Sequence, residues 1–140
     1  MNEAESAEVT SLFHILSDIE RVADHAENIA ELADIMRAED LTCVDAVAEE
    51  LQKMSDVTIA CYNNSIRALK MKDKKLAQAA LDAEADVDRM KARYRSRHIN
   101  RLSADEYSVR SGVIFLEMLN NLERITDHSK NIAETVLKPV

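Results

Sequence analysis

Pairs of acidic residues spaced four positions apart are the feature of this sequence most suited to chemistry. Glu20 and Asp24 form one pair, and Glu123 and Asp127 form another. Residues with this spacing lie on one face of an α-helix, about 40° apart around its axis. Two negative charges so placed destabilise an isolated helix by roughly 0.2–0.5 kcal/mol, so we expect a cation between them. That cation is a metal ion or, as the spacing alone favours, an Arg or Lys of a neighbouring helix.

The two pairs belong to an internal repeat. The segment from Glu20 reads ERVADHAENIAE and the segment from Glu123 reads ERITDHSKNIAE, so equivalent residues lie 103 positions apart. The apolar pairs Leu16/Leu119 and Ile19/Leu122 extend the match. Two segments this similar are copies of one motif.

The composition predicts an all-α protein. Hydrophobic residues make up 46% and charged residues 31% of the 140 residues, with one Gly, one Pro and no Trp, which leaves little turn-forming material for a sheet. Apolar periodicity predicts four helices, over about 4–37, 45–70, 73–98 and 106–137. A start signal at 42–45 precedes the second helix, Asp73 begins the third, and a capping box at 103–106 begins the fourth. Short connections favour a single-domain, antiparallel four-helix bundle.

The first predicted helix carries an apolar seam at alternating steps of three and four. This seam, which we expect to face the core, consists of Leu12, Leu16, Ile19, Ala23, Ala26, Ala30 and Ala33. Gly112 occupies the position equivalent to Val9 at the edge of the seam, and we expect it to mark a close contact between helices.

Charge and missing motifs exclude several classes of protein. A net charge of -8 argues against binding to nucleic acid or to an anionic membrane surface. No apolar run approaches the roughly 18 residues of a membrane helix, and no signal peptide is visible. No nucleophile–base pair or nucleotide loop is visible, so we do not expect an enzyme. Cys43 and Cys61 are expected to be reduced and buried.

A basic run lies towards the end of the third predicted helix. It comprises Lys91, Arg93, Arg95, Arg97 and Arg101. Positive charge is favourable at the C-terminal end of a helix. A solvated cationic end is therefore the favoured interpretation, and anion binding is the alternative.

The repeated motif and the run from Ser111 to Arg124 resemble the PhoU family of phosphate-transport regulators. The second run is also similar to the PhoU-like cytosolic domain at the C-terminus of bacterial sodium/phosphate cotransporters. The resemblance implies a cytoplasmic regulatory domain of a sodium-dependent phosphate transporter, which acts on phosphate uptake through contacts with a phosphate transporter or a phosphate-sensing protein. The alternatives are a free-standing regulator of an ATP-driven phosphate importer and its sensor, or a metal-free dimerisation bundle.

The resemblance also implies an architecture. A full PhoU-like protein has two tandem three-helix units, each with the motif on its third helix. The chain would then contain one whole unit preceded by the last helix of another, which makes a fragment of a longer transporter the expectation. An exposed flank of the first helix, with Ile15, Val22, Ile29 and Met36, would then favour a homodimer.

In this family, acidic pairs on neighbouring helices hold iron or other divalent metal ions. The matching pairs here are Glu84/Asp88, Glu123/Asp127 and Glu20/Asp24. If the third and fourth helices pack side by side, the first two pairs converge with Asn131 nearby, whereas Glu20/Asp24 would lack its companion. His25 and His128 are expected to form hydrogen bonds rather than bind metal.

Overall fold

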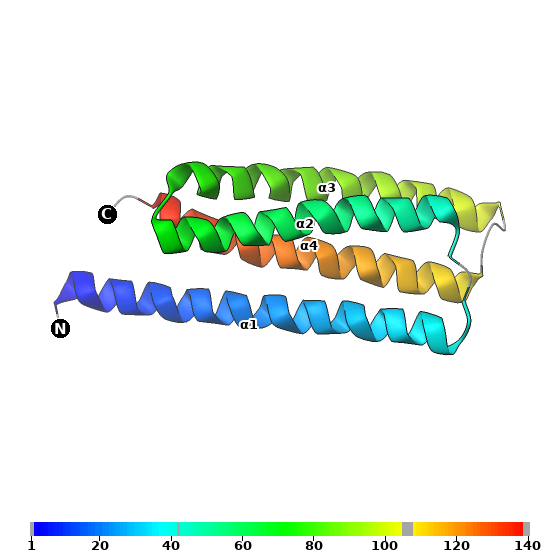
Figure 1. Ribbon diagram of the computed structural model, residues 1–140, viewed down its shortest axis with the longest axis horizontal. Coiled ribbons are helices and arrows are strands. Elements are labelled where there is room, and N and C mark those ends of the chain that lie inside the picture. The colour runs from blue at the N-terminus through cyan, green and yellow to red at the C-terminus, as the bar shows by residue number, and fades with distance from the viewer. Residues whose placement is uncertain (1, 42, 105–107, 139–140) are drawn as a thin grey trace.

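The computed structural model describes residues 2–41, 43–104 and 108–138, which form four α-helices. Helix α1 spans Glu3–Ala38, α2 Asp45–Met71, α3 Lys74–Ser103 and α4 Val109–Leu137. Consecutive helices run in opposite directions, and both termini lie at the same end of the bundle (Figure 1). The predicted all-α four-helix bundle is therefore confirmed.

Most helix ends follow from local side-chain chemistry. Asn2 caps α1 and forms a capping box with Glu5. The predicted cap of α3 is also present, because the Asp73 carboxylate accepts hydrogen bonds from the backbone N–H groups of the second and third residues after it. Lys72 closes α2 with a left-handed conformation (φ 54°).

Two predicted helix starts need correction. The capping box predicted at 103–106 is wrong, since α3 continues to Ser103 and Ser108 caps α4 with its hydroxyl. The rest of that box, at 105–106, lies outside the described residues, as does Thr42 of the start signal predicted for α2. Val44 occupies the N-cap position of α2 and makes no side-chain cap.

Helices α2, α3 and α4 pack against one another, whereas α1 packs on α4 (Figure 1). Met54 of α2, Val87 of α3 and Leu119 of α4 meet in the centre of the three-helix unit. A second apolar cluster, near the α2–α3 turn, is built from the small residues Cys61, Ala68, Ala77, Ala80 and Ala133. This arrangement gives α4 contacts on both sides and leaves much of α1 exposed.

The seam predicted to bury α1 is the wrong one. The flank expected to be exposed is covered instead, since Ile15 and Val22 are buried against α4, and Ile29 and Met36 on the same face are partly buried. Leu12 and Leu16 of the predicted seam are instead 50% and 60% exposed. Both faces of α1 are apolar, and sequence periodicity alone does not indicate which one meets the neighbouring helix.

Gly112 allows α3 and α4 to approach closely, as expected. A Cβ atom at this position would lie 2.7 Å from Cε1 of the buried His98 and 3.1 Å from Cδ2 of Leu102. We expect Gly112→Ala to destabilise the protein by roughly 1–3 kcal/mol, although Ala is the better helix former by roughly 1 kcal/mol. Chemical denaturation measures this loss, with the exposed Ser96→Ala as control. A Gly112→Ala protein as stable as the wild type would contradict this prediction.

The two cysteines differ in their surroundings. Cys61 is buried as predicted, and its thiol donates a hydrogen bond to the carbonyl oxygen of Ala80. Burial and the nearby Glu84 raise the pKa of Cys61 to about 12, so the thiol stays protonated. Cys43 is exposed, which corrects the expectation that both are buried.

Candidate functional site

Three of the predicted acidic residues come together between α3 and α4. One carboxylate oxygen from each of Glu84, Asp88 and Asp127 lies within 4.8 Å of the other two. Glu84 and Asp88 occupy successive turns of α3, and α4 runs beside α3 and supplies Asp127. The cluster therefore depends on the side-by-side packing of α3 and α4, which was the condition for the expected convergence of these acids.

The electrostatics of this cluster favour a cation. Glu84 is 8% exposed. Burial raises its pKa to about 7, and Asp88 adds to the rise through a hydrogen bond and its charge. Partial burial also raises the pKa of Asp127, which stays accessible to solvent, together with the charges of Glu123 and Asp88. Three carboxylates held this close repel one another, and hard divalent cations prefer such oxygen ligands. The residues present therefore fit a divalent metal ion.

The fourth predicted acid takes a different partner. Glu123 accepts a hydrogen bond from Lys91 Nζ at 3.1 Å, across the α3–α4 interface. The ion pair that spacing alone favoured is thus present at Glu123, whereas Asp127 joins the acidic cluster. Asn131, expected nearby, instead donates a hydrogen bond to Asp18 of α1 at 3.2 Å.

The structure does not bring Glu20 and Asp24 into this cluster. Both side chains are exposed on α1, which packs on α4 and not on α3. Among the described residues, no third His, Cys, Asp or Glu completes a ligand group around them. The two copies of the motif therefore have different surroundings on their acidic side.

The His and Asn residues of the two motif copies join α1 to α4. His25 Nδ1 lies 3.1 Å from Oδ1 of Asn121, which also accepts a hydrogen bond from Asn28. Reciprocally, His128 Nδ1 lies 3.0 Å from Oδ1 of Asp18. The two imidazole rings stack with centroids 5.6 Å apart. These contacts confirm that both histidines form hydrogen bonds.

The acceptors in these contacts were missed by the sequence analysis. Asp18 and Asn121 are themselves 103 positions apart, so they occupy equivalent places just before the two motif copies. The histidine of each copy thus contacts the acceptor that precedes the other copy. These reciprocal contacts relate α1 and α4 by an approximate two-fold symmetry. A comparison of the two copies that included the polar positions before Glu20 would have indicated Asp18 and Asn121.

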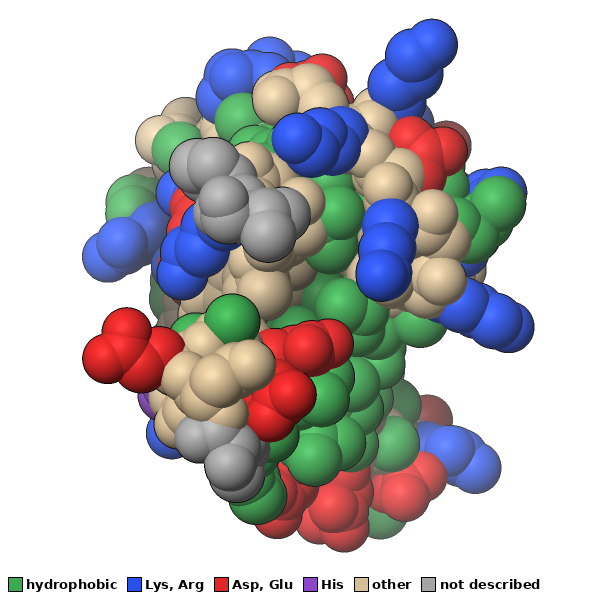
Figure 2. Space-filling view, turned by 90° about the vertical axis from the view of Figure 1, so that its left-hand side faces the viewer, with side chains coloured by type: hydrophobic (Ala, Val, Ile, Leu, Met, Phe, Trp, Pro, Cys, Tyr) green, Lys and Arg blue, Asp and Glu red, His purple; other side chains and the backbone are tan. Residues whose placement is uncertain are grey.

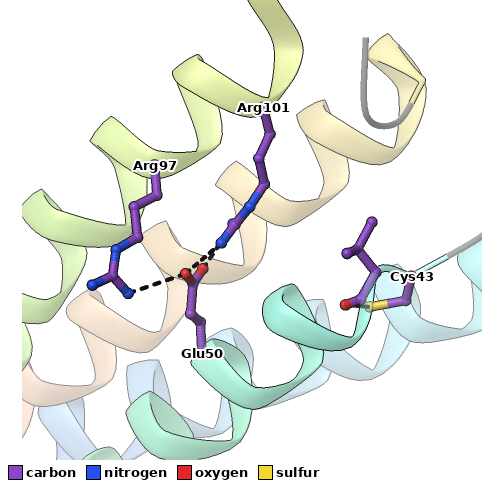
Figure 3. A network of polar contacts seen from close by, with 5 residues as sticks. Cys43, Glu50, Arg97 and Arg101 are labelled. Atoms are coloured by element: carbon purple, nitrogen blue, oxygen red, sulfur yellow. Dashed lines mark hydrogen bonds and ion pairs between the residues drawn. The ribbon is translucent and has the colours of Figure 1, made fainter. Parts of the chain in front are cut away.

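Part of the basic run forms a buried ion pair, which corrects the expectation of a solvated cationic end. Glu50 projects from α2 towards Arg97 and Arg101 of α3 (Figure 3). Arg101 donates two hydrogen bonds to Glu50, at 2.6 and 2.9 Å, and the two side chains are 12% and 6% exposed. Arg97 makes a longer contact of 3.3 Å and stays half exposed. This network joins α2 to α3 near the end opposite the two termini.

Comparison with known proteins shows similarity to one family. A family model described as "PhoU domain" matches residues 1–33 and 51–136, which is most of the chain. Both copies of the motif lie within the matched residues. No solved structure matches at a comparable level of significance.

Curated relatives carry the same family name. The chain is 27% identical over 132 residues to a phosphate-specific transport system accessory protein PhoU homolog of Xylella fastidiosa, covering 93% of this chain and 54% of that protein. It is 23% identical over 129 residues to PhoU homolog 1 of Thermotoga maritima, covering 92% and 55%. The chain thus spans about half the length of these relatives. Within the described residues, none of the helices has the length and apolar character needed to cross a membrane.

Proposed function

We propose that this chain, which belongs to the PhoU family, is a non-enzymatic regulatory domain of phosphate uptake on the cytosolic side of the membrane. The family match over both motif copies is the observation that carries the proposal. The relatives are named as accessory proteins of phosphate-specific transport systems. Regulation would proceed through docking of helical faces on a transporter or a phosphate-sensing protein.

Two kinds of phosphate-uptake protein could contain or use this domain. The names of the relatives favour an accessory protein of a phosphate importer. Attachment to a sodium-dependent phosphate cotransporter stays a prediction from the resemblance of residues 111–124. Either context uses the same mechanism, in which the three-helix unit of α2, α3 and α4 is a rigid docking body.

The regulatory role is tested in the organism that encodes the chain. Deleting the coding segment should change phosphate uptake when phosphate is plentiful, and a copy of the wild-type segment should restore it. The control is a frame-shifted copy, which should not restore it. Uptake that is the same with and without the segment, at high and at low phosphate, would contradict the proposed function.

The second part of the proposal is that the domain binds a divalent metal ion, such as iron. Glu84, Asp88 and Asp127 would hold the ion through carboxylate oxygens. The ion would supply positive charge that offsets the repulsion among the three acids and links α3 to α4. Because a ligand that binds the folded state alone stabilises it, metal binding would stabilise the docking body against unfolding.

Two alanine variants separate this site from a simple ion pair. Asp127→Ala should remove binding of Mn²⁺ while the fold survives, because the side chain is exposed. Glu123→Ala should have a smaller effect on Mn²⁺ binding, because that carboxylate pairs with Lys91. Calorimetric titration measures the binding, and circular dichroism checks the fold. Unfolding of both variants would identify the acids as structural ion-pair partners instead.

A further inference from the structure

The turn between α2 and α3 concentrates positive charge in an otherwise acidic chain. Residues 67–75 contain five Lys or Arg and one Asp, whereas the whole chain has a net charge of -8. All five cationic side chains are exposed. None of them takes part in an ion pair with another of the described residues. We name this group the basic tip: Arg67, Lys70, Lys72, Lys74 and Lys75.

The basic tip lies at one end of the bundle. The α2–α3 turn projects at the same end as the two termini (Figure 1). Seen from that end, most Lys and Arg side chains lie over the upper half, where α2 and α3 are, and most Asp and Glu side chains lie in the lower half (Figure 2). The exposed acids Glu3, Glu5 and Glu8 begin α1, which packs on α4 and not on α2 or α3. Positive and negative charge are therefore separated across this end.

Local helix stability does not account for most of these cations. Lys70 is favourable, because it lies at the negative, C-terminal end of α2. Lys74 and Lys75, however, are the first two residues of α3, where the positive end of the helix disfavours cations. Lys72 occupies a left-handed position (φ 54°), which glycine adopts with the least strain. Three of the five cations thus stand where the helices alone favour other residues, which points to a role outside the fold.

An exposed apolar side chain lies within the basic tip. Met71 is the last residue of α2, between Lys70 and Lys72, and it is 62% exposed. A Lys side chain can lay its aliphatic stem along apolar material and keep its ammonium group in water. Apolar side chains next to cations are the combination with which proteins enter the boundary between lipid headgroups and acyl chains.

We propose that the basic tip and Met71 bind the surface of a membrane that contains anionic lipids. The five cations would lie among the headgroups, and Met71 would reach the boundary with the acyl chains. Charges act on such a surface only within about 8 Å at physiological salt. The argument from net charge against an anionic membrane therefore does not apply to this end of the molecule, because the acids of α1 lie apart from the tip.

The features of the tip favour a lipid surface over an acidic protein or a nucleic acid. The cations stand on flexible stems with no ion-pair partner among the described residues to fix their directions, which suits a fluid layer of headgroups. The tip is a projecting turn, which suits a flat surface (Figure 1). Met71 would gain little from a polar polyanion. This inference goes beyond the proposed function, because it rests on a turn outside both motif copies and holds whether or not the chain regulates phosphate uptake.

Co-sedimentation of the 140-residue chain with lipid vesicles tests the proposal. Vesicles that contain phosphatidylglycerol should bind the chain, vesicles of phosphatidylcholine alone should not, and binding should weaken as salt is added. The double variant Lys74→Gln and Lys75→Gln should bind at least about tenfold more weakly, because each Lys near an anionic surface contributes roughly fivefold. Circular dichroism checks that this variant keeps its helices, which we expect because both side chains are exposed.

The matched control is the double variant Arg93→Gln and Arg95→Gln. It changes the net charge by the same amount, at exposed positions of α3. These positions lie roughly 30 Å along the helix from the tip. The control should therefore bind the vesicles as the wild type does.

A fluorescent variant places Met71 at the lipid. The chain contains no Trp, so the emission of Met71→Trp reports on this position alone. With vesicles that contain phosphatidylglycerol, the emission should shift to shorter wavelength, and with polyglutamate it should not. Ile99→Trp, at a 52% exposed position towards the other end of α3, is the control and should keep its emission.

Four results would overturn the proposal. They are equal binding to the two kinds of vesicle, absence of binding to the anionic vesicles even at low salt, undiminished binding of the Lys74 and Lys75 variant, and an equal loss in the Arg93 and Arg95 control. Polyglutamate bound as tightly as the vesicles, with the emission of Met71→Trp unchanged in both, would also overturn it and would identify an acidic protein as the partner.

Discussion

Replacing Glu50 by alanine should destabilise the protein by about 3 kcal/mol, at the lower end of the range for breaking a buried ion pair. The Glu50 side chain is 6% exposed and accepts two hydrogen bonds from Arg101, which is itself 12% exposed. The substitution would remove both hydrogen bonds and the negative charge that lies beside the largely buried guanidinium of Arg101. Urea denaturation monitored by circular dichroism measures the change.

Arg97→Ala is the matched control for this substitution. Arg97 contacts the same carboxylate, at 3.3 Å, but its side chain is 52% exposed. Exposed ion pairs contribute roughly 0–1 kcal/mol, so this variant should lose little stability. Equal losses for Glu50→Ala and Arg97→Ala would show that Arg101 and Glu50 do not form a specially stabilising pair.

The second large effect is a dependence of stability on pH that originates at Glu84. Burial raises the pKa of this carboxyl group to about 7 in the folded protein, from an ordinary value of 4.5. Between these values the folded state holds a proton that the unfolded state has lost. The metal-free protein should therefore lose stability as the pH rises through 7, by on the order of 2 kcal/mol between pH 5 and pH 8.

Glu84→Gln should remove this pH dependence. The neutral amide cannot ionise, so the variant should be more stable than the wild type at pH 8 and similar to it at pH 5. Glu117→Gln, at an exposed position of α4, is the control and should follow the wild type. Denaturation curves at both pH values measure the effect; a wild-type stability that increases from pH 5 to pH 8 in chelator would contradict the assignment to Glu84.

Much of the fold follows from local signals in the sequence. The apolar period of 3.6 residues places α1 and α2 within a few residues of their observed ends, and the caps at Asn2 and Asp73 mark the starts of α1 and α3. The boundary between α3 and α4 was misplaced, because Ser103 and Ser108 both precede helix-forming residues. Only Ser108 begins a helix, since α3 continues through the first of the two serines.

The candidate site was predictable in part. Glu84, Asp88 and Asp127 converge because both acidic helices are regular and pack side by side, which spacing and resemblance together indicated. The pairing of Glu123 with Lys91 depends on the rotation of α3 about its own axis, and no pattern in one sequence fixes that angle. For the same reason the buried position of Glu50, opposite Arg101, was not foreseen.

Helix α1 shows the limit of reasoning from periodicity. It has two apolar faces at helical spacing, one with Ile15 and Val22 and one with Leu12 and Leu16. Which face is buried depends on the polar contacts of His25 and His128, which orient α1 on α4. Those contacts require both copies of the motif and their acceptors, Asn121 and Asp18, to be considered together.

Anomalous diffraction from crystals of the 140-residue chain grown with Mn²⁺ tests the metal site directly. We predict one peak at the manganese edge, within about 2.0–2.6 Å of carboxylate oxygens from Glu84, Asp88 and Asp127. That peak should be absent from crystals of Asp127→Ala grown in the same way. Crystals of the wild type without a peak between α3 and α4, or with the peak at the His25–His128 pair instead, would contradict it.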